Sequence, residues 1–216
     1  MNVDSARRQM IEQQVRAWEV LDERVLGVLA QVRRELFVPS AYRQLAFADT
    51  AIPLRPGSAM LPPKVEGRIL QALDLDGQDD VLEVGTGSGF FAACLSRLSQ
   101  RVRSLEIHKD LTERARENLR AAGIDRVELE TADAMQLTDS NRFDAIAVTG
   151  SLPLEDPRFE RALKVGGRLF VIVGEAPVME ASLVRRISER EWVRESLFET
   201  VVEPLVNAAA PPRFVF

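Results

Sequence analysis

Cysteine and histidine are almost missing from this sequence, which has one of each, Cys94 and His108, in 216 residues. A single cysteine excludes an internal disulfide framework and suits a reducing compartment. Because structural and catalytic zinc sites are built largely from these two residue types, we expect no metal site. Cys94 lies in an apolar helical stretch, which predicts a buried, unreactive thiol rather than a nucleophile.

Long apolar runs and a basic face are missing too. No stretch is apolar for long enough to cross a membrane, and the first twenty residues are charged throughout, unlike a secretory signal. The formal net charge is −5 and the arginines are scattered among acidic residues, which disfavours sequence-independent binding of nucleic acid. We therefore expect a cytoplasmic monomer with no membrane or nucleic-acid partner.

The chain divides into two parts of one predicted domain, residues 1–216, which is long enough for a full core. Residues 1–63 indicate a helical extension, in which Asp22 precedes an amphipathic helix. The density of prolines between Thr50 and Pro63 predicts an ordered but irregular loop, the candidate substrate loop of this chain. Residues 64–216 alternate between helix and strand and form the predicted core.

This alternation predicts an α/β fold with a Rossmann-like, mostly parallel sheet covered on both faces. Two alternating segments near the end, 182–187 and 192–202, predict an antiparallel hairpin added to the sheet edge. The predicted parallel strands are 81–84, 102–107, 127–129, 143–148 and, after a tight turn at Gly166-Gly167, 168–173.

Smaller signals mark the ends of elements. Asp110, with Glu113 three residues later, predicts an N-terminal helix cap, and Gly123 is placed to end that helix. The alanine- and proline-rich stretch 207–212 predicts a surface loop. Residues 214–216 are apolar, and the pattern leaves open whether they pack against the core or are disordered.

The most informative motif is Glu83-Val84-Gly85-Thr86-Gly87-Ser88-Gly89, between a predicted strand and a helix that begins at Phe90. Such a loop brings backbone N–H groups close to a ligand. A dinucleotide fingerprint requires glycine at Phe90, so the spacing disfavours a nicotinamide-dependent oxidoreductase. The pattern resembles the cofactor loop of class I S-adenosylmethionine-dependent methyltransferases. The alternative is a loop whose glycines merely let a helix pack close to a strand.

Two carboxylates follow later strands. Glu106 ends the second strand, where a carboxylate can accept hydrogen bonds from both hydroxyls of a ribose. Asp133 follows the third strand, a natural place to meet an adenine amino group. Each alone is equally well explained as a solvated acid or a turn residue. Because the carboxyl ends of parallel strands share one edge of the sheet, both converge on the glycine loop, which favours a binding site.

Over nearly its whole length the chain resembles the protein-L-isoaspartate O-methyltransferases. The N-terminal blocks and the proline-rich loop are more particular to this family than the glycine loop is. The resemblance implies S-adenosylmethionine as methyl donor and an isoaspartyl carboxylate of a protein or peptide as acceptor. The matching segments are 10–15, 22–26, 32–39, 48–54, 83–89, 104–107, 143–149, 163–169 and 203–205.

The resemblance also implies roles for single positions. Met60 lies in the loop nearest the transferred methyl group, where cofactor contact and simple packing are equally open. The implied cofactor-binding residues are Gly85, Thr86 and Gly87 around the methionine part with Glu83 nearby, Glu106 and Ile107 at the ribose and adenine, and Asp133 with Ala134 at the adenine edge.

The chain departs from the family in the substrate loop. Between Gly57 and Pro63 the family has Gln-Thr-Ile-Ser and one further residue, whereas this chain has Ser58-Ala59-Met60-Leu61-Pro62. The serine assigned to the family's active site therefore falls on Leu61, which cannot donate a hydrogen bond. Ser58 is the nearest hydroxyl, and the hydroxyls of Thr50, Thr149 and Ser151 are further candidates.

The departure leaves three functions open. An isoaspartyl carboxylate is already ionised at neutral pH, so its methylation needs alignment and exclusion of water but no general base. Backbone N–H groups of residues 57–61 can then still hold the carboxylate, and we expect intact cofactor binding with weak or absent turnover of isoaspartyl peptides. The alternatives are a methyltransferase of this lineage with another, unidentified small acceptor, and a cofactor-binding protein without catalysis.

Overall fold

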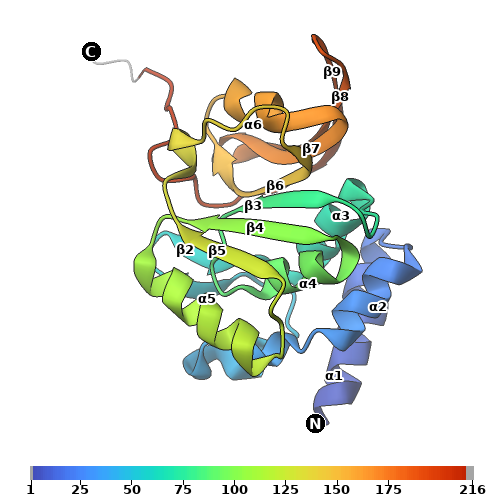
Figure 1. Ribbon diagram of the computed structural model, residues 1–216. Helices are drawn as coiled ribbons and strands as arrows, with labels where there is room; N and C mark the ends of the chain where they lie inside the picture. Colours follow the sequence, from blue (N-terminus) through green and yellow to red (C-terminus); the bar gives the residue numbers. More distant parts are fainter. Residues whose placement is uncertain (1, 213–216) are drawn as a thin grey trace.

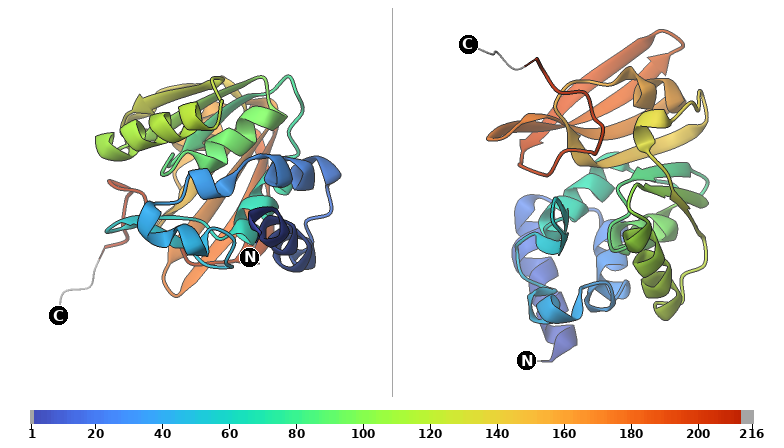
Figure 2. Two further views of the ribbon diagram at one scale, coloured as in Figure 1. Left: turned by 90° about the horizontal axis from the view of Figure 1, so that it is seen from below. Right: turned by 90° about the vertical axis from the view of Figure 1, so that its left-hand side faces the viewer.

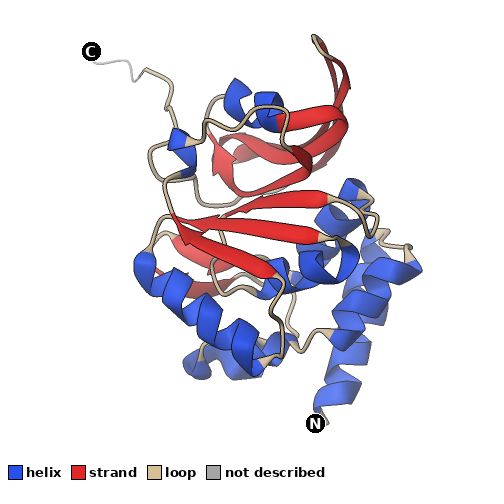
Figure 3. Ribbon diagram, viewed as in Figure 1, coloured by secondary structure: helices blue, strands red, loops and turns tan. Residues whose placement is uncertain are grey.

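The computed structural model describes residues 2–212, and its centre is a seven-stranded sheet in the order β5-β4-β3-β6-β7-β8-β9 (Figures 1 and 3). Neighbours from β5 to β7 are parallel, and β8 and β9 are added antiparallel. The predicted fold class is confirmed. The strands are β3 (Asp80–Val84), β4 (Arg101–Glu106), β5 (Val127–Thr131), β6 (Phe143–Leu152), β7 (Leu163–Glu175), β8 (Val178–Ser188) and β9 (Glu191–Glu199).

Both faces of the sheet are covered because the central strands direct apolar side chains to both faces. Along β6, Ala145 and Ala147 belong to one buried cluster and Ile146 and Val148 to the other, as the alternation of a strand requires. The first cluster packs against helices α2 to α5, and the second against α6 and the turn η5. The helices that cover the sheet are α3 (Pro63–Leu73), α4 (Phe90–Leu98), α5 (Lys109–Ala121), η5 (Ala134–Gln136) and α6 (Pro157–Ala162).

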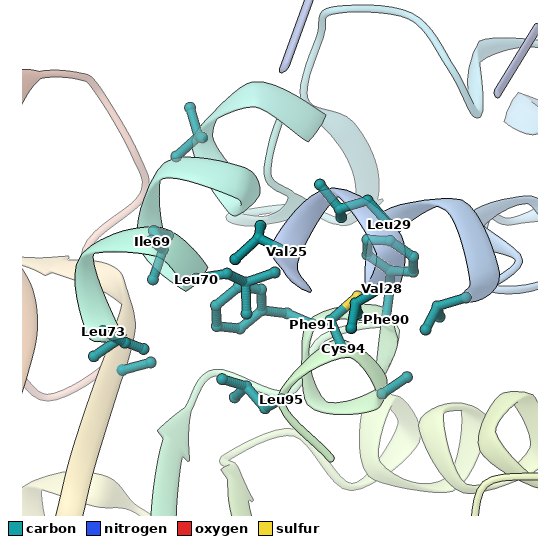
Figure 4. Packing of buried hydrophobic residues seen from close by; sticks show 14 of the residues in the cluster. Val25, Val28, Leu29, Ile69, Leu70, Leu73, Phe90, Phe91, Cys94 and Leu95 are labelled. Atoms are coloured by element: carbon teal, nitrogen blue, oxygen red, sulfur yellow. The ribbon is translucent and has the colours of Figure 1, made fainter. Parts of the chain in front are cut away.

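The N-terminal extension adds a second helical layer to one side of the sheet (Figures 1 and 2). The Asp22 side chain accepts a hydrogen bond from the Arg24 N–H and caps α2, as predicted. Figure 4 shows α2, α3 and α4 packing through Val28, Leu70 and Phe91. The extension comprises α1 (Val3–Met10), the π-helical turn η1 (Ile11–Val15), η2 (Arg16–Trp18), α2 (Glu23–Gln31), η3 (Arg34–Leu36) and η4 (Ser40–Leu45).

The proline-rich stretch corrects one prediction. Instead of an irregular loop, it contains an antiparallel hairpin of β1 (Ile52–Arg55) and β2 (Ser58–Met60), turned at Gly57 with φ +74°. Proline is tolerated at an edge strand, where a missing N–H leaves no ladder bond unmade. We call this unit, residues 52–60, the substrate hairpin.

Two boundary predictions are also wrong. Gly166 and Gly167 lie inside β7, at a register shift against β6, rather than in a turn before the strand. His108, not Asp110, occupies the N-cap of α5, and Asp110 lies in the first helical turn, where its charge complements the helix dipole. Gly123 follows the helix end with φ +67°, as expected.

The C-terminal hairpin β8–β9 and the burial of the Cys94 thiol are as predicted. Residues 207–212 have no regular secondary structure beyond a turn, and positions 214–216 lie outside the described residues. Within residues 2–212, no helix is long and apolar enough to span a membrane. The same range holds no cluster of three or more potential metal ligands.

Candidate active site

A cavity of about 620 Å³ lies at the carboxyl ends of the parallel strands, the edge that faces the viewer in the right-hand view of Figure 2. This volume is typical of sites for small organic ligands. One end of the cavity is lined by the ends of β3, β4 and β5. The other end is lined by the substrate hairpin with Leu61 and Pro62, by residues 149–153 and 174–179, and by residues 200–206.

The glycine loop has a conformation that only glycine adopts without strain. Gly85, Gly87 and Gly89 have φ values of +97°, +53° and +85°. A Cβ on Gly85 would lie 2.4 Å from the Thr149 Oγ1, and that hydroxyl bonds to the Val84 and Gly85 carbonyls. Gly85 and Gly87 therefore present bare backbone to the cavity.

Glu106 joins the loop to the end of β4. Its Oε2 accepts a hydrogen bond of 2.9 Å from the Gly87 N–H, and its Oε1 accepts one of 3.0 Å from the His108 N–H. The residue is 5% exposed and lines the cavity. Each carboxylate oxygen retains a lone pair, so Glu106 can hold the loop and still accept bonds from a ligand's hydroxyl groups.

Asp133 lies at the far side of the same end. Its Oδ1 caps the turn η5 by accepting from the Met135 N–H, and its Oδ2 accepts a bond of 3.0 Å from the Asn207 side chain. Ile107 and Ala134 line the cavity beside it. The structure thus brings together the residues predicted for the ribose and adenine.

Two predicted cofactor residues lie behind the loop instead of lining the cavity. Glu83 is fully buried and accepts from the Ser104 hydroxyl, which lies 2.5 Å from the Thr86 Oγ1. Burial, together with the neighbouring carboxylates of Glu106 and Glu66, raises the pKa of Glu83 to about 8. The Glu83 carboxyl is therefore largely protonated at neutral pH. This chain of three polar side chains supports the loop from beneath.

The substrate hairpin brings Ser58, Met60 and Leu61 to the cavity. Met60 is buried, and Leu61 is half-buried. Of the other candidate hydroxyls, those of Thr149 and Ser151 also line the cavity, but both already donate to main-chain carbonyls. Ser58 has no hydrogen-bond partner for its hydroxyl in the described part of the chain, so it is the hydroxyl most free to meet a ligand.

The C-terminal wall of the cavity carries residues that sequence reasoning did not single out. Residues 200–206 turn back along β6, where the Ser151 N–H donates to the Glu203 carbonyl and the Leu205 N–H donates to the Ser151 carbonyl. A Cβ on Gly150 would lie 2.6 Å from Leu205. The segment 203–205 matches the family in sequence. Periodicity does not reveal that it lies beside Ser151, which is far away in the chain.

The charges at the cavity suit a particular chemistry. Within residues 2–212 the lining includes the carboxylates of Glu106, Asp133, Glu175 and Glu203 and the imidazole of His108, but no lysine or arginine. A cofactor with a positive centre is favoured by such surroundings, and a bound acceptor anion meets no cationic side chain. The site has the elements for binding and aligning two reactants, not for acid–base relay.

Comparison with known proteins identifies the family. The model of the protein-L-isoaspartate(D-aspartate) O-methyltransferase family matches residues 5–210. Protein-L-isoaspartate O-methyltransferase 2 of Pelobacter propionicus is 36% identical over 216 residues, covering 96% of both chains. The protein-L-isoaspartate O-methyltransferase of Methanoculleus marisnigri is 36% identical over 199 residues, covering 89% of this chain and 90% of the relative.

A solved structure has the same fold. It is a Plasmodium falciparum protein described as a protein-L-isoaspartate O-methyltransferase in complex with S-adenosyl-L-homocysteine. It superposes with a TM-score of 0.81 at 20% identity, covering 95% of this chain and 98% of that one. With a family model matched over most of its length and curated relatives at more than a third identity, the chain belongs to the protein-L-isoaspartate(D-aspartate) O-methyltransferase family.

Proposed function

We propose that this protein transfers the methyl group of S-adenosylmethionine to the free carboxylate of L-isoaspartyl residues in damaged proteins and peptides. The observation that carries the proposal is one continuous cavity in which the glycine loop, Glu106 and Asp133 face the substrate hairpin. Family membership supports the same donor, acceptor and reaction, and it favours them over an unrelated acceptor or a non-catalytic role.

The cavity fits the donor in size and in the groups that it presents. Gly85 and Gly87 form a cradle of bare backbone in which an added Cβ would crowd Thr149 or Leu54, and the methionine part would lie next to it. Glu106 would accept from the ribose hydroxyls, with Ile107 beside the adenine. Asp133 and Ala134 would meet the adenine edge. Glu83 and Thr86 would act on the donor through the loop that they support.

The reaction needs little chemistry from side chains. The donor supplies a methyl group on a positively charged sulfonium, and the acceptor carboxylate supplies the electron pair that forms the new carbon–oxygen bond. Opposite charges disappear in this step, so an environment poor in water and in fixed cations accelerates it. The apolar side chains of Met60, Leu61 and Leu205 exclude water, and the missing lysine and arginine leave the carboxylate nucleophilic.

The acceptor carboxylate would be held at the substrate hairpin. Ser58 offers its hydroxyl, and Leu61 occupies the position of the family's serine without supplying one. Main-chain N–H groups of the hairpin supply the remaining donors. Met60 would lie nearest the methyl group. We further propose a cytoplasmic monomer without nucleic-acid or membrane partners, in keeping with a net charge of −5 and a single buried cysteine.

A methyl-transfer assay tests the proposal. Purified protein with radiolabelled S-adenosylmethionine is offered an isoaspartyl peptide and the same peptide with normal aspartate. We expect saturable methylation of the isoaspartyl peptide alone, and binding of S-adenosylhomocysteine but not NAD by calorimetry. Methylation of neither peptide, with intact S-adenosylhomocysteine binding and labelling of another acceptor in a lysate, would contradict the proposed acceptor.

A further inference from the structure

Arg34 is a buried charge in the helical extension that the proposed reaction does not use directly. It is 1% exposed, although an unpaired guanidinium in the interior is strongly unfavourable. Its Nη1 donates to the Glu66 carboxylate, which is also buried, and its Nε donates to the Ala46 carbonyl at 2.9 Å. The remaining nitrogen, Nη2, donates to the Leu61 carbonyl at 2.7 Å.

These bonds converge on one corner of the chain. Leu61 follows the last residue of β2, and Pro62 and Pro63 then lead into α3, where Glu66 lies in the first turn. Neither proline has an N–H, so neither can donate a backbone hydrogen bond, and the Leu61 carbonyl is bonded by Arg34 instead. The Arg34 guanidinium bonds on both sides of it. Its plane also lies over the Phe90 ring, 4.7 Å from the centroid, at the start of α4 and directly after the glycine loop.

Stability alone does not account for this arrangement. A buried ion pair is often no more stabilising than apolar side chains of the same size, because removing both charges from water offsets their attraction. What apolar side chains cannot supply is a directed bond to the Leu61 carbonyl. Since Leu61 has no hydroxyl, recognition of the acceptor falls on the Ser58 hydroxyl and on the main chain of residues 58–61. The bond from Arg34 fixes the end of this segment.

We propose that Arg34 is a positioning residue for methyl transfer: it holds the backbone of residues 58–61 in the geometry that receives the acceptor carboxylate. The expected effect of Arg34 on turnover rests on the proposed function. The order that Arg34 imposes on the hairpin is a property of the fold and is measurable without any acceptor.

The extension contains a matched control. Arg7 and Glu35 form a second buried pair at 2.7 Å, with side chains 10% and 11% exposed, and neither has a hydrogen bond to the substrate hairpin. Replacing each pair by apolar side chains gives Arg34→Met with Glu66→Leu, and Arg7→Met with Glu35→Leu. Arg34→Lys is a milder variant, because one ammonium cannot reach all three acceptors with the geometry of a guanidinium.

The experiment measures amide hydrogen exchange of a peptide covering residues 57–62, the affinity for S-adenosylhomocysteine, and kcat and KM for an isoaspartyl peptide. For Arg34→Met with Glu66→Leu we expect exchange at least tenfold faster and kcat/KM at least tenfold lower. S-adenosylhomocysteine affinity should stay within threefold. Arg34→Lys should show the same changes to a smaller extent, and it serves alone if the double variant does not fold.

The control pair should leave exchange at 57–62 and kcat/KM within twofold of the wild type, even where its melting temperature falls. Unchanged exchange in both Arg34 variants, or an equal loss of kcat/KM in the control, would overturn the positioning role. If the wild-type protein binds S-adenosylhomocysteine but does not methylate the isoaspartyl peptide, the proposed acceptor fails. The exchange measurement still decides what Arg34 does.

Discussion

The two ends of the cavity are built in different ways. The donor end comes from three successive strand-to-helix connections, between Glu83 and Ala134, so its parts are near neighbours in the sequence. The acceptor end assembles the substrate hairpin, residues 149–153 and residues 200–206, which are far apart in the chain. The glycine loop of the donor end takes its conformation from its own glycines, with Thr149 bonding its carbonyls, whereas the acceptor end depends on packing between distant segments. Substitutions at the two ends should fail in different ways.

The largest expected effect concerns the base of the donor end and depends on pH. Burial raises the pKa of Glu83 to about 8, above its ordinary value of 4.5. Between these values the unfolded chain releases a proton that the folded protein retains, so stability falls as pH rises and levels off above about pH 8. Glu66, whose pKa is also raised by burial, contributes in the same direction.

Glu83→Gln removes the first of these titrations while keeping a neutral side chain of similar shape. We expect the wild-type free energy of unfolding to fall by about 3–4 kcal/mol more than that of the variant between pH 5 and pH 8, at about 1.4 kcal/mol per pH unit. Urea denaturation at several pH values measures this. Parallel curves for the two proteins would mean that Glu83 is ionised in the folded state.

The second prediction strains the glycine loop. Gly85→Ala places a Cβ against the Thr149 hydroxyl at a φ of +97°, so we expect unfolding to be easier by about 2–3 kcal/mol and donor affinity to fall at least tenfold. The matched control is Gly123→Ala, which has a positive φ but nothing within 4 Å of the added atom. It should lower stability by about 1 kcal/mol and leave affinity unchanged. Equal losses of donor affinity in Gly85→Ala and Gly123→Ala would contradict the assignment of Gly85 to the donor site.

The third prediction separates binding from folding. Glu106→Ala should weaken S-adenosylhomocysteine binding by about 1–3 kcal/mol, because charge-assisted hydrogen bonds to the ribose are lost. Stability should fall by only about 1 kcal/mol, from the bonds to the Gly87 and His108 amides. Glu106→Gln, which keeps one acceptor oxygen, should lie between. Calorimetry measures the affinity for S-adenosylhomocysteine and thermal melts measure the stability. A large loss of stability at unchanged affinity would mean that Glu106 has only a structural role.

The smallest effect belongs to the acceptor end. Ala59→Thr with Leu61→Ser restores the family's hydroxyls and should raise kcat/KM for isoaspartyl peptides by about tenfold, the lower end of what one hydrogen bond to an ionised group contributes. Donor affinity should not change. Single-turnover assays at saturating donor make the comparison. If the wild type already turns over at ordinary enzymatic rates and the double variant gains nothing, main-chain donors suffice.

Sequence reasoning succeeded where the determinants are local. The strands, the glycine loop and the order of Glu106 and Asp133 follow from periodicity and from the rule that ligands bind at the carboxyl ends of parallel strands. It failed at the proline-rich stretch, which forms a hairpin whose far end bonds to Arg34, a distant residue that the local pattern does not reveal. It placed Thr86 beside the methionine part with Glu83 nearby, whereas the structure buries both side chains beneath the loop. Spacing along a strand does not distinguish a side chain beneath a loop from one above it.

The packing of η2 against β9 through aromatic rings affects how the chain folds while it is being synthesised. The ring centroid of Trp18, the last residue of η2, lies 5.0 Å from that of Phe198 on β9, and the Phe198 centroid lies 6.3 Å from that of Phe170 on β7. A ribosome makes Trp18 long before Phe198, so the extension lacks this partner while the residues between them are synthesised. A chain stalled before β9 would leave Trp18 exposed as an apolar surface to which chaperones can bind.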